Sequence, residues 1–289
     1  MSTLTTPAEI SFDSGGVRLV ADRWEPAGER RGTVLLLHGG GQRRHSWHTT
    51  GHRLAGQGWT TIAPDARGHG DSDRSPDGDY SADVLIRDLS VIVGQIGEPC
   101  VLVGASMGGM TALVGQGEQG DLASALVLVD IVPRVDPAGV RRIMDFMSSA
   151  PDGFASLEDV VEAIRAYNPH RKRPPTPDGV RRNVRQAENG RWFWHWDPAL
   201  LRRGDEPRRD ADEDRAKAAA RKIDVPTLLV HGTESDIVTA AGIEEFTRLI
   251  PGAEHFAVTG AGHMVAGDDN DVFTGRVGEF LGRLPARAG

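Results

Sequence analysis

With 289 residues, of which 39% are hydrophobic and 26% charged, the chain has the composition of a soluble globular protein with a sizeable core. Its formal net charge of −8 argues against a nucleic-acid partner, and its single cysteine, Cys100, excludes an intramolecular disulfide. The sequence shows neither a basic-then-apolar leader nor an apolar run long enough to span a bilayer, so we expect a cytoplasmic protein that does not bind membranes.

Strands and helices are predicted to alternate along most of the chain. Two extended segments, 9–12 and 17–24, come first. Continuous apolar runs typical of buried strands follow at 32–40, 59–70, 101–103, 125–133, 225–232 and 253–263. Helices are predicted between them at 80–96, 107–113 and 241–249. This alternation predicts an α/β fold whose mostly parallel sheet is covered on both faces and gathers reactive groups at the carboxyl ends of its strands.

The alternation stops between Pro133 and about Asp224. This region contains an amphipathic helical stretch over 157–167, the aromatic run RWFWHW at 191–196 and a long charged stretch. We interpret it as an insertion carried above the sheet. The predicted organisation is therefore a core made of residues 1–133 and 216–289, interrupted by a lid made of residues 134–215.

The sequence Gly104-Ala105-Ser106-Met107-Gly108 links a predicted strand to a predicted helix. A tight turn at this point would lift the Ser106 hydroxyl out of the sheet, and small neighbours leave the backbone room to bend. A serine hydroxyl is a poor nucleophile until a base takes its proton. Ser106 is the candidate nucleophile if the rest of the chain supplies that base.

His263 and Asp236 are candidate partners for Ser106, and each follows a predicted strand. An imidazole can take the serine proton near neutral pH, while a carboxylate holds the imidazole tautomer and stabilises the imidazolium. Asp130, which ends the run LVLVD, is the alternative carboxylate. All of these groups are expected at one edge of the sheet, where they can converge on one point.

The chain order of serine, acid and histidine resembles that of the α/β-hydrolases, and the resemblance covers essentially the whole chain. It implies an eight-stranded, mostly parallel sheet with helices on both faces and a helical lid insertion. It also implies that the segment HGTESDIV carries the acid, which favours Asp236, although some members place the acid where Asp130 lies. By the same resemblance, the backbone N–H groups of Gly40 and Met107 form the oxyanion hole, with Gly41 as an alternative to Gly40.

Polar residues around the GGG triplet are assigned supporting roles. His38 is expected to brace the oxyanion loop by hydrogen bonding. Three residues of the segment DARGHGDSD are expected to hold loops together rather than to touch substrate: Asp65, Arg67 and His69.

Three histidines, His45, His48 and His52, have helical spacing, but no neighbouring cysteine or carboxylate completes a metal site, so no metal is expected. The same region contains three candidates for the mouth of the pocket, with placement on the surface as the alternative: Arg43, Arg44 and Trp47.

The substrate pocket is predicted to include aromatic and sulfur-containing side chains of the insertion. Trp192, Trp194 and Trp196 alternate along an extended segment, so their indoles can share one side. They either fix the lid to the core or cover the pocket and select a bulky apolar substrate. The residues predicted to line the pocket are Trp194, Phe146 and Met144.

These features together predict a serine hydrolase that cleaves a small to medium, apolar carboxylic ester or lactone through an acyl-enzyme intermediate. A small-molecule substrate is the one expected partner, and no cofactor is expected. Epoxide and haloalkane hydrolysis are set aside because those relatives need a carboxylate nucleophile where this chain has Ser106. Two alternatives remain open: a carbon–carbon bond hydrolase of a ring-cleavage pathway, and a ligand receptor with a vestigial triad.

Overall fold

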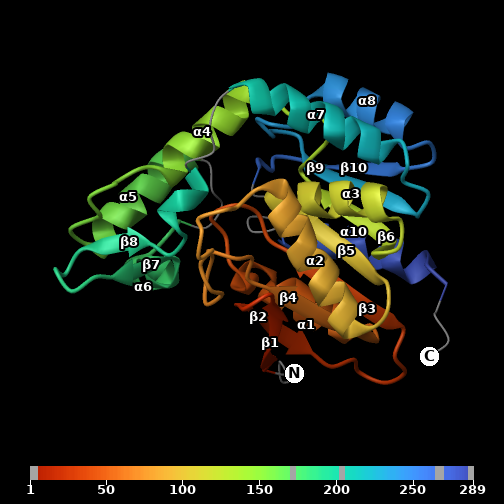
Figure 1. The fold of residues 1–289 in the computed structure, drawn as a ribbon, viewed down its shortest axis with the longest axis horizontal. Coiled ribbons are helices and arrows are strands. Elements are labelled where there is room, and N and C mark those ends of the chain that lie inside the picture. The colour runs from red at the N-terminus through yellow and green to blue at the C-terminus, as the bar shows by residue number, and fades with distance from the viewer. Residues whose placement is uncertain (1–5, 170–173, 202–205, 264–269, 286–289) are drawn as a thin grey trace.

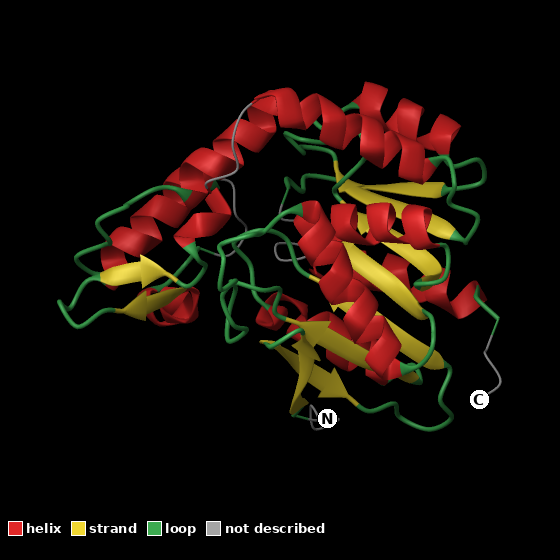
Figure 2. Cartoon of the chain, in the orientation of Figure 1, coloured by secondary structure: helices red, strands yellow, loops and turns green. Residues whose placement is uncertain are grey.

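An eight-stranded β-sheet runs through the centre of the molecule (Figures 1 and 2). The computed structural model describes residues 6–169, 174–201, 206–263 and 270–285. In the order in which they lie in the sheet, the strands are β1 (Ala8–Ser14), β2 (Val17–Trp24), β4 (Trp59–Pro64), β3 (Gly32–Leu37), β5 (Cys100–Ala105), β6 (Ala123–Val129), β9 (Thr227–Gly232) and β10 (Glu254–Val258).

The sheet is parallel from β4 to β10, whereas β1 and β2 form an antiparallel hairpin and β2 pairs antiparallel with β4. The connections are made mainly by α1 (His48–Ala55), α2 (Ala82–Ile96), α3 (Met107–Gln119), α7 (Glu206–Ala220) and α8 (Ala240–Leu249), and α10 (Asn270–Arg283) follows β10. The predicted fold class, a mostly parallel eight-stranded sheet between helices, is confirmed.

Apolar side chains on the central strands point alternately to the two faces of the sheet. On β5, Leu102 packs into the cluster that contains α2, α3 and α8, whereas Val101 and Val103 pack into the cluster that contains α1 and α10. Figure 1 shows these two sets of helices on opposite sides of the sheet. Burial on both faces explains why the strand sequences are apolar throughout, since each buried leucine or valine stabilises the fold by about 1.5–3 kcal/mol.

The chain between β6 and β9 builds a separate small layer that extends away from the sheet (Figure 1). Its elements before α7 are α4 (Pro137–Met147), α5 (Leu157–Tyr167), α6 (Pro177–Val180), η2 (Arg181–Asn183), β7 (Val184–Gln186), β8 (Trp192–Trp194) and η3 (Pro198–Leu201). We call residues 134–201 the insertion. It has a hydrophobic cluster of its own, and the hydroxyl of Tyr80 links it to the core by donating to Asp197 Oδ2 at 2.6 Å.

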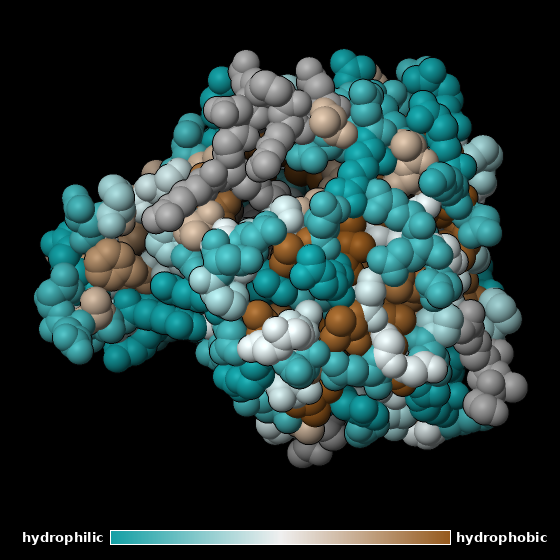
Figure 3. All heavy atoms as spheres, in the orientation of Figure 1, coloured by the Kyte–Doolittle hydropathy of each residue, from teal (hydrophilic) through white to brown (hydrophobic). Residues whose placement is uncertain are grey.

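Helix α7 leads from the insertion back to the sheet and crosses residue 215, the boundary predicted for the lid. Its last two turns pack on α3, where Ala216 and Ala219 are buried. The face shown in Figure 3 is mainly hydrophilic, with hydrophobic side chains only in small groups. None of the described helices is both long and apolar enough to cross a bilayer.

Substitution by alanine is predicted to have opposite effects on stability at two helical glycines, because one lies where α3 packs on α7 and the other lies in an open part of α2. A β-carbon on Gly117 would lie 2.3 Å from the carbonyl oxygen of Ala219, so Gly117→Ala must push the two helices apart. A β-carbon on Gly94, in α2, meets nothing within 4 Å. We expect Gly117→Ala to lower the free energy of unfolding by about 1–3 kcal/mol and Gly94→Ala to raise it by up to about 1 kcal/mol, as measured by urea denaturation. Equal effects of the two substitutions would contradict this packing.

Candidate active site

Ser106 occupies the sharp turn between β5 and α3. Its backbone has φ 46° and ψ −113°, a conformation that costs a residue with a side chain about 1–3 kcal/mol. The sheet holds the serine there, because its N–H donates to the carbonyl oxygen of Val129 on β6 at 3.1 Å. The turn presents Ser106 to a cavity, as predicted from the sequence motif.

Two glycines allow this turn to pack. A β-carbon on Gly108 would lie 2.6 Å from the carbonyl oxygen of Leu37, at the end of β3. A β-carbon on Gly104 would lie equally close, 2.6 Å, to the carbonyl carbon of Gly108. The spacing of the glycines around Ser106 therefore follows from the close approach of α3 to the strand ends.

His263 lies beyond β10 and lines the same cavity as Ser106. Its Nδ1 is 2.8 Å from Oδ2 of Asp130, which follows β6 and has a side chain only 1% exposed. The carboxylate also accepts hydrogen bonds from the Gly232 N–H at 2.9 Å and from the Ser235 hydroxyl at 2.6 Å. A buried carboxylate needs such donors, and here they fix it against the imidazole.

The preference for Asp236 as the partner of His263 is wrong. Asp236 instead faces helix α4 of the insertion, where its Oδ2 lies 3.1 Å from Nη2 of Arg142. The strands β6 and β9 are neighbours in the sheet, so both deliver a carboxylate to the same edge, and sequence order alone does not separate them. Ser235, which no sequence motif marks, supports Asp130: its hydroxyl donates to the Asp130 carboxylate at 2.6 Å and accepts from the N–H of Val238 at 3.1 Å.

The glycine loop after β3 presents an N–H group beside the serine. The Gly39 N–H donates to Gln42 Oε1 at 3.0 Å and the Gly41 N–H donates to His69 Nε2 at 3.1 Å. Within the described part of the chain, the Gly40 N–H has no such partner. Met107, as the first residue of α3, likewise has no helical carbonyl to bind. Gly40 and Met107 both line the cavity. The N–H of Gly41, the alternative donor, is already bound to His69.

A cavity of about 800 Å³ connects this group of residues with the insertion. The predicted pocket residues Trp194, Phe146 and Met144 all line it. Trp194 stacks on Trp196, with ring centroids 4.7 Å apart and planes 12° apart, and its edge meets Phe154. The two stacked indoles thus both contact the cavity and fill the core of the insertion.

The family model for the alpha/beta hydrolase fold matches residues 32–269 of this sequence. The chain belongs to this family. It is 31% identical over 256 residues to an esterase of Mycobacterium tuberculosis, covering 85% of this chain and 80% of the relative. It is 29% identical over 264 residues to the sn-1-specific diacylglycerol lipase of Mus musculus, with 86% and 80% covered.

Solved structures agree with this assignment. The Mycobacterium tuberculosis esterase, 26% identical, superposes with a TM-score of 0.75 and covers 96% of this chain and 93% of its own. E-2-(acetamidomethylene)succinate hydrolase superposes with a TM-score of 0.80 over 96% and 99% of the two chains, and at 21% identity that likeness concerns the fold. This α/β-hydrolase is thus a hydrolase whose relatives include esterases and lipases.

Three buried histidines of this α/β-hydrolase support the glycine loop and the loop that follows β4. His38 donates from Nδ1 to the Gly39 carbonyl oxygen at 2.8 Å and accepts at Nε2 from the Ala66 N–H at 2.9 Å. His69 donates from Nδ1 to the Arg67 carbonyl oxygen at 3.1 Å and accepts at Nε2 from Gly41. His195, on the insertion, accepts at Nδ1 from the Gly70 N–H at 3.0 Å.

These hydrogen bonds require neutral rings, because each ring accepts at one nitrogen. Burial lowers the pKa of His69 to about 3, and the neighbouring His38 adds to the effect. Burial likewise lowers the pKa of His38 and takes that of His195 well below its ordinary value. Near neutral pH the three rings therefore serve as uncharged braces, the role expected for His38 and His69.

Buried ion pairs hold the neighbouring loops of this α/β-hydrolase. Arg67 donates to both oxygens of Asp88 at 2.6 Å. Arg44 binds Asp65, and Asp65 also accepts from the Arg44 N–H at 2.6 Å. Arg44 and Trp47, both considered for the mouth of the pocket, are buried in the core instead, and of that set only Arg43 lines the cavity.

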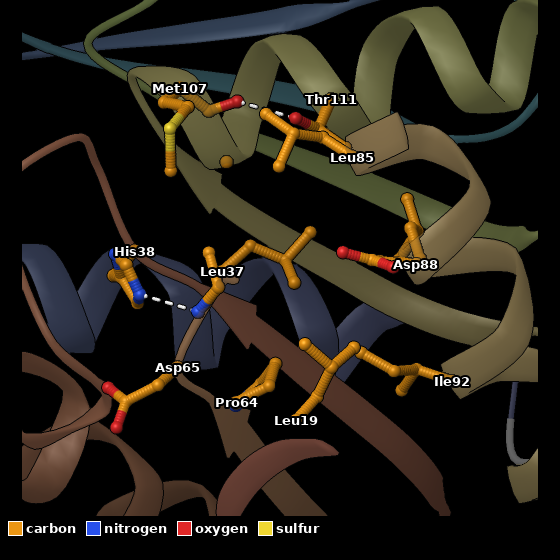
Figure 4. A pocket seen from close by; sticks show the side chains of 13 residues that line it. Leu19, Leu37, His38, Pro64, Asp65, Leu85, Asp88, Ile92, Met107 and Thr111 are labelled. Carbon is orange, nitrogen blue, oxygen red and sulfur yellow. Dashed lines mark hydrogen bonds between the residues drawn. The ribbon is translucent and has the colours of Figure 1, made fainter. Parts of the chain in front are cut away.

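A second cavity of about 50 Å³ lies below the glycine loop, between the ends of β3 and β4 and the helices α2 and α3 (Figure 4). Leu19, Leu37 and Ile92 contribute to its mainly apolar wall.

Of the three histidines considered for a metal, His45 and His48 have ring centroids 5.3 Å apart. Among the described residues, no group of three side chains suited to hold a metal ion is present.

The neutral histidines predict acid sensitivity. Below about pH 6.5 the histidines of the unfolded chain bind protons, while the folded chain does not protonate His69 until about pH 3. The unfolded state then binds more protons, so the free energy of unfolding falls as the pH is lowered, by up to about 1.4 kcal/mol per pH unit for each such histidine.

Urea denaturation between about pH 7 and pH 5 measures this slope. His69→Gln removes the titrating ring but keeps an oxygen that can accept from Gly41, so it should flatten the dependence. His255→Gln, at an exposed position, is the matched control and should leave the slope unchanged. A slope that is the same in all three proteins would show that His69 is not held neutral.

Proposed function

We propose that this α/β-hydrolase is a carboxylic ester hydrolase of the serine type, which cleaves a small to medium, apolar ester or lactone through an acyl-enzyme intermediate. The observation that carries the proposal is the hydrogen bond from His263 Nδ1 to the buried carboxylate of Asp130, since His263 lines the same cavity as Ser106 in its strained turn. Esterases and lipases among the relatives support ester chemistry.

In this proposal His263 is the general base. Because its Nδ1–H is donated to Asp130, the proton on the imidazole is held at Nδ1 and Nε2 is left to accept the proton of Ser106. The Ser106 oxygen attacks the carbonyl carbon of the ester, and the imidazolium that forms is stabilised by the adjacent carboxylate. His263 then gives its proton to the departing alkoxide, and the alcohol leaves.

The negative oxygen of the tetrahedral intermediate is stabilised by the N–H groups of Gly40 and Met107. Each such donor lowers the barrier by about 3 kcal/mol. Met107 also lies at the N-terminus of α3, where the helix dipole favours negative charge. Water activated by His263 then attacks the acyl-enzyme, and the acid is released as Ser106 regains its proton.

Substrate size follows from the cavity and its lining. A volume of about 800 Å³ accommodates a small or medium molecule. Trp194, Phe146 and Met144 present apolar surface to it, which favours an apolar acyl or alcohol group. A substrate held against these apolar side chains displaces water from the cavity, and the electrostatic interactions with the oxyanion are stronger without that water.

A fluorophosphonate should react with one residue of the wild-type protein. We expect intact-mass spectrometry to show a single adduct, because the reagent labels an activated serine, and none on Ser106→Ala. Ser149→Ala removes a hydroxyl beside Trp194 and is the matched control that should label like the wild type. An undiminished adduct on Ser106→Ala would overturn the assignment of the nucleophile.

The two aspartates should differ sharply in ester hydrolysis. Asp130→Asn removes the acceptor that fixes the His263 tautomer, so kcat should fall on the order of 10⁴-fold. Asp236→Asn removes only the pairing with Arg142, whose side chain is 61% exposed, and should leave kcat within a few-fold of the wild type. Steady-state kinetics on a panel of 4-nitrophenyl esters makes the comparison, and the reverse ranking would move the acid to Asp236.

A further inference from the structure

One wall of the large cavity differs in chemistry from the apolar wall of the insertion. It is formed by the segment from the glycine loop to the start of α1 and by η2 of the insertion, and its polar members are Gln42, Arg43, His45, Ser46, Thr49, Arg182 and Asn183. A hydrogen bond of 2.6 Å from Arg43 Nη1 to the Arg182 carbonyl oxygen joins the loop and η2. We call these residues the polar wall.

Most of the positive charge near the polar wall is already neutralised by carboxylates. Arg44, which is itself buried, binds Asp22, Asp65 and Asp71. Arg43 donates from Nη2 to Asp71 at 2.8 Å. These pairs fix the loop and leave little charge for a ligand.

Arg182 is different, because no carboxylate among the described residues pairs with it. Its side chain is exposed, and its guanidinium contacts Nε2 of His45. Burial lowers the pKa of His45, and the neighbouring Arg182 lowers it further, so the imidazole is neutral and accepts from the guanidinium. A guanidinium has five donors, and one imidazole nitrogen uses only a part of them.

Arg182 is linked to the loop that carries Gly40, the proposed oxyanion donor. Arg43 follows the oxyanion glycine Gly40 by three residues, and its hydrogen bond to the carbonyl oxygen of Arg182 ties η2 to that loop. The loop that carries Gly40 is therefore tied directly to η2, and His69 braces the same loop at Gly41. A substrate bound at Gly40 can extend along the cavity to the polar wall.

We propose that Arg182 binds a carboxylate of the substrate, so that the preferred ester is one whose acyl part ends in a carboxylate while its apolar atoms lie against Trp194 and Phe146. A guanidinium matches the planar carboxylate with two parallel hydrogen bonds. Asn183 and Ser46 supply neutral hydrogen-bonding groups beside it. This inference rests on the proposed ester hydrolysis and narrows its substrate class to an ester that is apolar except for one terminal carboxylate on the acyl part.

The test compares two esters that differ only in charge: the 4-nitrophenyl monoester of glutaric acid and the same compound with its free carboxyl methylated. For the wild type we expect kcat/KM to be higher for the acid. Arg182→Gln should lower the acid-to-methyl-ester ratio of kcat/KM by about 10- to 100-fold, the range for a charged hydrogen bond, and Arg182→Lys should restore part of it.

The matched control is Arg181→Gln. Arg181 is the preceding residue, but its guanidinium lies over the ring of Trp192, 5.2 Å from the centroid, and it does not line the cavity. This variant should keep the wild-type ratio. A ratio that Arg182→Gln leaves unchanged, or that Arg181→Gln lowers equally, would overturn the inference.

Binding to Ser106→Ala protein separates recognition from turnover. Titration calorimetry should show the glutarate monoester binding more tightly than its methyl ester, and adding Arg182→Gln should abolish the difference. If the wild type hydrolysed neither ester, the result would contradict the proposed function alone. The calorimetric comparison would still decide the role of Arg182. Equal binding of the two esters to Ser106→Ala would refute carboxylate recognition alone.

Discussion

The buried carboxylate of Asp130 is the group on which the geometry of the candidate site depends. It is fully buried, and an ionised carboxylate in such a place is stable only when donors surround it. The donors come from two other segments: Gly232 and Ser235 at the end of β9, and His263 beyond β10. One side chain thus ties three carboxyl-terminal loops of the sheet together and fixes the orientation of the imidazole.

The sheet also holds two strained residues in place at its carboxyl edge. Ser106 and Asp130 both have positive φ, 46° and 49°, at the ends of the neighbouring strands β5 and β6. Each N–H remains bonded to the next strand, Ser106 to Val129 and Asp130 to Val230. The ladder of backbone hydrogen bonds therefore supplies the stability that holds the backbone of these two candidate residues in strained conformations, at an edge where a cavity opens.

Much of this arrangement could be predicted from the sequence, because it follows from local patterns. Apolar strands and their order predict the parallel sheet, and the glycines around Ser106 predict the turn, since the close approach at Gly104 and Gly108 admits no side chain. The acid could not be chosen in this way. Asp130 and Asp236 reach the same edge from adjacent strands, and only the tertiary contact of Asp130 with His263 Nδ1 distinguishes them.

The polar wall shows a second limit of sequence patterns. Arg182 lies in a short 3₁₀ turn of the insertion, 139 residues from its neighbour Arg43, and nothing in the adjacent sequence marks it as part of the cavity. Arg43 and Arg44 look alike in sequence, yet one lines the cavity and the other is buried among carboxylates. Only the folded arrangement separates an arginine that is buried among carboxylates from one that lines the cavity.

The central claim, that Asp130 holds the imidazole of His263, is tested most directly by proton NMR of the ring Nδ1–H. A proton shared between an imidazole nitrogen and a buried carboxylate gives a resonance far downfield of the amides, which His263→Gln would assign by its loss. We predict that this resonance persists in Asp236→Asn and disappears or moves strongly upfield in Asp130→Asn. Its persistence in Asp130→Asn together with its loss in Asp236→Asn would contradict the pairing of Asp130 with His263.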